Sequence, residues 1–168
     1  MILIGIGSNL ASAYGPPRET CAAALKALAS EAVEIVAHSR WYRSSPVPMS
    51  DQPWFVNGVA AVTTDHSAPS LLHTLHAVEA AFGRPSTETR AAERNAARIL
   101  DLDLLAYGDL VRDGPEPPVL PHPRLAKRAF VLLPLREIAP EWRHPVSQLE
   151  VAALIEALDQ EGIVQPLD

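Results

Sequence analysis

The residues best suited to chemistry lie together in the segment Arg98–Leu105, which reads Arg-Ile-Leu-Asp-Leu-Asp-Leu-Leu. On a strand, Asp101 and Asp103 point to the same face, roughly 6.6–6.8 Å apart, and Leu102 and Leu104 point to the other. Paired carboxylates suit one or two Mg²⁺ ions, which can clamp the oxygens of an in-line phosphoryl displacement. The same spacing also fits the solvated face of an amphipathic strand, so the pattern alone leaves both interpretations open.

Arginines gather just before this pair of aspartates. The guanidinium group is planar and binds phosphate with two parallel hydrogen bonds. The chain has only two lysines, and neither lies in the glycine-rich loop that cradles phosphates in many nucleotide-binding proteins. A nucleotide would therefore be held by side chains and metal, and the nearby candidates are Arg84, Arg90, Arg94 and Arg98.

Further candidates lie outside this segment. His122 stands between two prolines and could donate to a phosphate, or it could simply bond to the backbone of its own loop. Phe55 and Asn57 share one face of an expected strand, and an amide can read the edge of a heterocycle because it carries both a donor and an acceptor. Phe55 and Phe130 could hold a flat ligand, although both also fit a hydrophobic core.

Composition limits the class of protein. The 168 residues carry 14 basic and 20 acidic side chains, a net charge of −6, and 48% of them are hydrophobic. These values predict one globular domain over residues 1–168. The acidic balance argues against nucleic acid as a partner. The single cysteine excludes an internal disulfide, and neither a membrane-length apolar run nor a basic leader is present, so the cytoplasm is the expected compartment.

Periodicity and turn residues predict the elements. Helices are expected over 16–30, 68–82 and 124–137, the last broken by Pro134, and a capping box at Ser147–Glu150 predicts a fourth helix to about residue 158. The order β-α-β-β-α-β indicates an α+β, ferredoxin-like antiparallel sheet with helices on one face, followed by C-terminal helices. Strands are expected over 1–8, 33–42, 55–64 and 99–107, and loops over 43–53, 84–97 and 108–121.

Several motifs occur in order over about residues 1–145: Ile6–Leu10, Tyr42–Pro46, Asp51–Asn57, Glu79 with Gly83-Arg84, Arg94–Leu105 and Leu120–Pro140. Together they resemble the motifs of the 6-hydroxymethyl-7,8-dihydropterin pyrophosphokinase family. That resemblance implies transfer of a diphosphoryl group from ATP to the hydroxymethyl oxygen of the dihydropterin, with release of AMP, in folate biosynthesis. It also implies a monomer.

The resemblance also implies a role for each matching residue. Asp101 and Asp103 would bind two Mg²⁺ ions, and the loop that contains Arg84 would close over ATP. Catalysis would depend on Asp101, Asp103, Arg98 and Arg84. The implied ATP contacts are Glu79, Arg84, Arg94, Arg98, His122 and Arg128, with Arg90 as the alternative to Arg94. The implied pterin contacts are Phe55 and Phe130 on the two faces of the ring, Asn57 at its edge, Asp101, and backbone groups near Ser44 and Val47.

Two other function classes remain open from the residues alone. A palm-like nucleotidyl transferase or nuclease also places carboxylates on a ferredoxin-like sheet, but it needs a basic surface that this sequence lacks. A non-catalytic ferredoxin-like module would bind a small ligand or a protein, and its function would not depend on Asp101.

Overall fold

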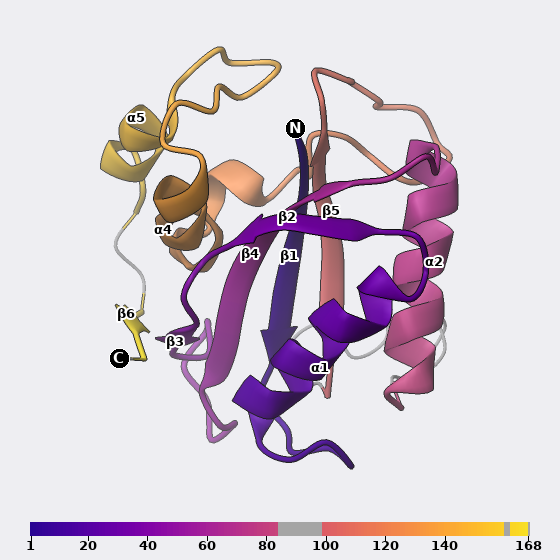
Figure 1. Cartoon of the computed structure of the whole chain (residues 1–168). Coiled ribbons are helices and arrows are strands. Elements are labelled where there is room, and N and C mark those ends of the chain that lie inside the picture. Colours follow the sequence, from indigo (N-terminus) through magenta and orange to yellow (C-terminus); the bar gives the residue numbers. More distant parts are fainter. Residues whose placement is uncertain (84–98, 160–161, 168) are drawn as a thin grey trace.

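The computed structural model describes residues 1–83, 99–159 and 162–167. In these residues the chain forms a six-stranded antiparallel sheet covered by helices (Figure 1). The strands are β1 (Ile2–Ser8), β2 (Glu34–His38), β3 (Tyr42–Ser44), β4 (Phe55–Thr63), β5 (Asp101–Tyr107) and β6 (Val164–Pro166). The helices are α1 (Pro17–Ala29), α2 (Ala68–Ala81), a 3₁₀ turn (Leu125–Lys127), α4 (Ala129–Ile138) and α5 (Val151–Glu156).

Strand β1 lies inside the sheet and pairs antiparallel with β4 on one side and β5 on the other. Strand β4 is long enough to have two partners along its other edge. Its second half pairs with β2, and its first three residues pair with β3. The order β5-β1-β4-β2 is that of the predicted ferredoxin-like fold, so the predicted α+β class is confirmed.

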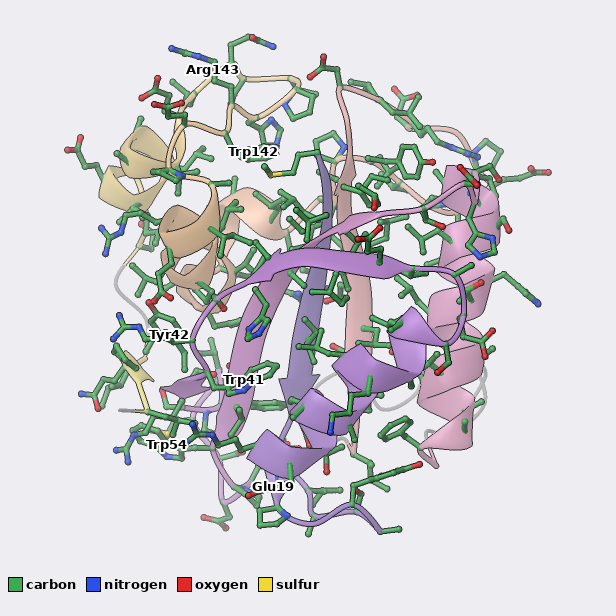
Figure 2. All side chains as sticks on the ribbon, viewed as in Figure 1. Glu19, Trp41, Tyr42, Trp54, Trp142 and Arg143 are labelled. Atoms are coloured by element: carbon green, nitrogen blue, oxygen red, sulfur yellow. The ribbon has the colours of Figure 1, made fainter. Side chains whose placement is uncertain are left out.

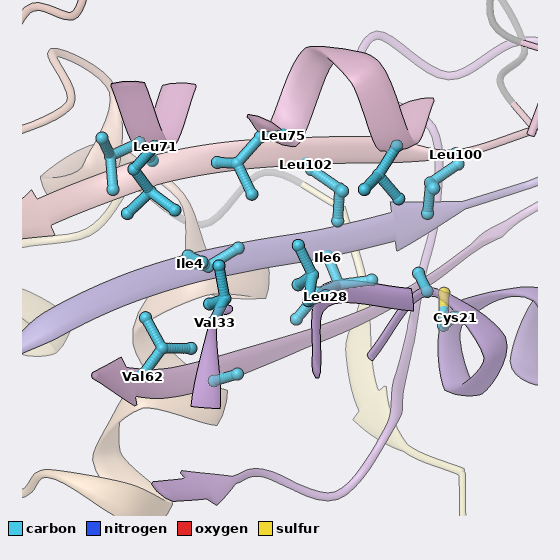
Figure 3. Packing of buried hydrophobic residues seen from close by; sticks show 14 of the residues in the cluster. Ile4, Ile6, Cys21, Leu28, Val33, Val62, Leu71, Leu75, Leu100 and Leu102 are labelled. Atoms are coloured by element: carbon cyan, nitrogen blue, oxygen red, sulfur yellow. The ribbon is translucent and has the colours of Figure 1, made fainter. Parts of the chain in front are cut away.

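Two hydrophobic cores lie on opposite faces of the sheet. Helices α1 and α2 cover one face, where they bury Ile4, Ile6 and Leu102 (Figure 3). Helices α4 and α5 cover the other face, where Leu3 and Leu105 are buried. Strands β1, β4 and β5 each supply both cores because their successive side chains alternate between faces. Within the described ranges, no helix is long and apolar enough to cross a membrane.

Three local expectations were wrong. The predicted strand 33–42 is divided into β2 and β3, and β3 extends to Ser44, inside the predicted loop. Helix α4 continues past Pro134 to Ile138, because burial of Leu132 and Leu135 against the sheet outweighs the backbone hydrogen bond that the proline removes.

The third concerns the predicted capping box at Ser147–Glu150. The Ser147 hydroxyl accepts from the Leu149 backbone N–H, and Gln148 has a φ of 63°, so this segment forms a turn. Helix α5 begins only at Val151 and ends at Glu156. The turn is more stable than the expected helix cap because the His144 ring also accepts hydrogen bonds from the backbone N–H groups of Val146 and Ser147.

The core makes a direct stability prediction. Leu28 on α1 has no exposed surface, and Leu28→Ala should lower the free energy of unfolding by about 2–5 kcal/mol. Leu110 is 41% exposed, and Leu110→Ala should cost well under half as much. Chemical denaturation of both variants checks the difference. Equal losses would contradict the assignment of Leu28 to the core.

Candidate active site

Two glycines of β1, Gly5 and Gly7, lie on the face of the sheet covered by α4 and α5. Gly7 lies between Asp101 of β5 and Asn57 of β4, and Gly5 lies next to Asp103 in the same way. Since neighbouring strands are about 4.8 Å apart, the backbones that carry Asp101 and Asn57 are about 10 Å apart across β1. A Cβ atom at Gly7 would lie 3.0 Å from Nδ2 of Asn57, and one at Gly5 would lie 3.4 Å from Cδ1 of Leu105. The two glycines therefore form a floor on which side chains of β4 and β5 lie close to the backbone of β1.

The two aspartates border this floor on one side. Both are partly exposed, and Leu102 between them is 2% exposed on the opposite face, as the alternation in β5 predicts. Oδ2 of Asp103 lies 3.5 Å from Nη1 of Arg128, the residue that precedes α4. The Arg128 guanidinium also lies over the ring of Phe130, 5.2 Å from its centre. The structure thus joins two predicted phosphate and metal residues to one predicted pterin residue.

Burial changes the proton affinities in this region. Burial lowers the pKa of Arg128, and the nearby carboxylate of Asp103 opposes that shift. The guanidinium keeps its charge nevertheless, because its ordinary pKa is far above 7. A positive charge that is partly removed from water attracts an anion more strongly than one on the open surface.

His122 approaches the same strand from the loop before the 3₁₀ turn. Its backbone N–H donates to the Leu105 carbonyl at 2.8 Å. Burial lowers the pKa of its ring to about 4, the positive charge of Arg128 adds to the effect, and Asp101 opposes it. Nδ1 accepts from the Arg124 backbone N–H at 3.2 Å, so the neutral ring carries its proton on Nε2. That N–H can donate to a phosphate oxygen.

The other side of the floor is formed by β3 and β4. The Ser44 hydroxyl donates to Oδ1 of Asn57 at 2.5 Å, which fixes the amide and leaves its NH₂ group above Gly7. Phe55 lies two residues earlier on the same face of β4 and is partly buried. Val47 follows in the loop after β3 and is 51% exposed.

Not every predicted residue lies on this face. Glu79 is 1% exposed on α2, which packs on the opposite face, and its Oε2 accepts from the Leu102 backbone N–H at 2.8 Å. Its contact with ATP stays a prediction. The predicted loop 84–97 and its residues Arg84, Arg90 and Arg94, together with Arg98, lie outside the described residues.

One cluster was missed by sequence reasoning. Glu137 near the end of α4 accepts hydrogen bonds from the Tyr42 hydroxyl and from the backbone N–H of Arg40, the latter at 3.0 Å. Tyr42 is labelled in Figure 2. Partial burial raises the pKa of Glu137, but the hydrogen bonds from Tyr42 and Arg40 outweigh it and leave the pKa below its ordinary value. The cluster ties α4 to the start of β3. No local signal reveals it, because Glu137 lies 95 residues after Tyr42 and 97 residues after Arg40.

The carboxylates at this site suit a divalent metal ion that brings further ligands with it. Within the described ranges, no group of three or more His, Cys, Asp or Glu side chains could hold a metal ion by itself. Mg²⁺ usually binds through one or two carboxylates together with substrate phosphates and water. Asp101 and Asp103 satisfy this requirement.

The fold and these residues define a class: an α+β protein whose sheet presents carboxylates, a guanidinium and aromatic rings on one face, as expected of an enzyme that acts on a phosphorylated and a planar compound. Residues 3–140 match the 7,8-dihydro-6-hydroxymethylpterin-pyrophosphokinase family (HPPK). The chain therefore belongs to this family, and the predicted family is confirmed.

Individual proteins of this family are similar to the chain over most of its length. A Synechocystis protein named 2-amino-4-hydroxy-6-hydroxymethyldihydropteridine pyrophosphokinase is 38% identical over 94% of this chain and 75% of its own length. A Pseudomonas aeruginosa protein of the same name is 40% identical over 96% of this chain and 94% of its own length. A crystal structure of a Plasmodium falciparum HPPK-DHPS variant has a TM-score of 0.69 and 14% identity over 92% of this chain. This chain covers 43% of that longer one, and the likeness shows the fold alone.

His122 should make stability depend on pH. Because its pKa falls from an ordinary 6.5 to about 4 on folding, the unfolded chain binds the extra proton between these values. The native state should therefore lose about 3 kcal/mol from this group between pH 7 and pH 4. His122→Gln should remove that loss, measured by urea unfolding of the metal-free protein across this range. His73→Gln, at an exposed histidine on α2, is the control. Parallel profiles for His122→Gln and the parent protein would contradict the assignment.

Proposed function

We propose that this chain transfers a diphosphoryl group from ATP to the hydroxymethyl oxygen of 6-hydroxymethyl-7,8-dihydropterin, in folate biosynthesis. The oxygen bonds to the β-phosphorus, the bond from that phosphorus to the α–β bridging oxygen breaks, and AMP leaves with that oxygen while the hydroxyl proton is released. Residues 1–168 act as one domain and as a monomer. The supporting observation is the row Asp101–Gly7–Asn57, in which a carboxylate-bearing residue of β5 and an amide-bearing residue of β4 flank the same glycine of β1.

The nucleotide side of this row carries the charge. Asp101 and Asp103 would hold two Mg²⁺ ions that arrive with ATP, and when bound these ions neutralise the triphosphate and polarise the β-phosphate. Arg128 binds a phosphate oxygen with its guanidinium, and His122 donates from Nε2. The contacts expected outside the face or outside the described residues are Glu79 on the adenosine side and Arg84, Arg94 and Arg98 on the phosphates.

The pterin side positions the acceptor. Phe55 and Phe130 lie on the two faces of the ring, and Asn57 reads its edge with an amide that Ser44 holds in place. Backbone groups near Ser44 and Val47 bind the remaining edge. Phosphoryl transfer depends mainly on alignment and charge neutralisation, so a rigid acceptor site next to the carboxylates is the main requirement. We assign no side chain as a general base.

The reaction has a direct assay. AMP should appear from ATP and Mg²⁺ only when 6-hydroxymethyl-7,8-dihydropterin is present. Asp101→Asn and Asp103→Asn should each lower kcat at least about 100-fold, or about 2.7 kcal/mol, with the melting temperature little changed. Asp109→Asn, at an exposed aspartate just beyond β5, should keep full activity. Full turnover by either of the first two variants would refute the metal assignment, and AMP release without pterin would refute the acceptor.

Phe130 tests the pterin site separately. Phe130→Ala should weaken pterin binding about ten-fold or more, because it removes one face of the sandwich, while ATP binding changes less than about three-fold. Phe130→Leu fills the space without a flat ring, so its pterin affinity should fall between that of the parent protein and that of Phe130→Ala. Calorimetry with each ligand alone gives both constants. A larger loss for ATP than for pterin would place Phe130 on the nucleotide side instead.

A further inference from the structure

Strand β6 lies beyond the residues that match the family, 3–140, and still contacts the candidate site. It runs antiparallel next to β3 and forms the last strand on that side of the sheet (Figure 1). Its register pairs Val164 with Ser44, and Ser44 is the residue whose hydroxyl holds Asn57. The strand therefore lies directly behind the proposed pterin wall.

Hydrogen bonds at both ends of β6 hold it to β3. The Ser45 N–H donates to the Ile163 carbonyl at 3.0 Å, and the Ile163 N–H donates to the Ser45 hydroxyl at 2.8 Å. At the other end, the Leu167 N–H donates to the Trp41 carbonyl at 3.0 Å. Pro166 lies between bonded positions, where the N–H it lacks would point away from β3. The proline thus leaves this pairing intact and makes the outer edge a poor partner for another strand.

Gly162 fixes how closely this segment approaches the loop after β3. Its φ is 74°, a conformation that side chains rarely adopt. A Cβ atom there would also lie 2.7 Å from Oγ of Ser45 and 3.1 Å from Cγ2 of Val47. Both the backbone conformation and the close approach require glycine. Any larger residue must displace the Ser45 hydroxyl and the Val47 side chain or move this segment away from them.

The loop after β3 depends on such external support. Strand β3 has only three residues, which is short for independent stability. The other end of its loop is held by Asn9, whose Nδ2 donates to the Pro53 carbonyl at 3.0 Å. Near Ser45 the support comes from Gly162 and Ile163. Ser44 itself stays paired with Phe55 of β4, so displacement of that segment would remove support mainly from the backbone between Ser45 and Val47.

We propose that residues Gly162–Leu167 are a positioning segment for the pterin: they hold the backbone of Ser44–Val47 in the conformation that binds the edge of the ring. This inference rests on the proposed function and extends it to a part of the chain that the family match does not include. The segment touches neither ATP nor the reacting atoms. Its loss should therefore act on pterin affinity and leave nucleotide affinity and the chemical step largely unchanged.

Three glycines provide a matched test in the full-length protein. Gly162→Ala should raise KM for the pterin about ten-fold or more, keep kcat within about three-fold, and leave the Kd for ATP within about two-fold. Gly108 has a φ of 59° but open space around it, so Gly108→Ala measures backbone strain alone. Gly114 has neither constraint, so Gly114→Ala should resemble the parent protein. Melting temperatures of all three variants show how much of any change is general destabilisation.

A second pair of variants keeps the test independent of folding at Gly162. Ile163→Pro removes the N–H that donates to Ser45, and Ile163→Ala keeps it while trimming a side chain that is 43% exposed. Only the proline variant should weaken pterin binding in calorimetry. The inference is overturned if the parent protein is active but Gly162→Ala and Ile163→Pro leave KM and Kd for the pterin unchanged, or if ATP binding weakens equally. A parent protein that binds no pterin and releases no AMP would instead refute the proposed function, and the inference with it.

Discussion

The alternation of β5 between two environments is the constraint on which the rest of the structure depends. Leu102 and Leu104 are buried against α1 and α2, and this burial fixes which face of the strand carries Asp101 and Asp103. A shift of one residue in register would drive both charges into the core and both leucines out of it. Burial of the two leucines therefore decides which way the two carboxylates point, although the leucines and the carboxylates lie on opposite faces of the strand.

The second helical layer turns this exposed pair into a site. Packing of Leu132 and Leu135 places α4 over the sheet, and the hydrogen bonds of Glu137 tie its far end to the segment before β3. Arg128 and Phe130 at the start of α4 are thereby carried toward β5. The same layer removes water from these groups, which strengthens their electrostatic interactions and keeps the ring of His122 neutral.

Local signals predicted the elements that local energies control. The helix expected over 68–82 is observed as α2 at Ala68–Ala81, where Ser67 caps its start by accepting from the Ser70 N–H and Gly83, with a φ of 95°, follows its end. Local signals failed where distant packing decides. Pro134 is tolerated because the sheet holds the helix around it, and β3 exists because β4 and β6 pair with it on both sides.

The sequence by itself determined the α+β class, the shared face of Asp101 and Asp103, and, through several motifs in order, the family. These properties follow from periodicity and from residue types at fixed spacing, which a chain carries before it folds. Only the tertiary structure decided that Gly5 and Gly7 form a floor between β4 and β5, that Glu79 faces the other layer, and that Gly162 supports Ser45. These contacts join residues far apart in the chain, and they stabilise the protein only after the strands have paired in the correct register.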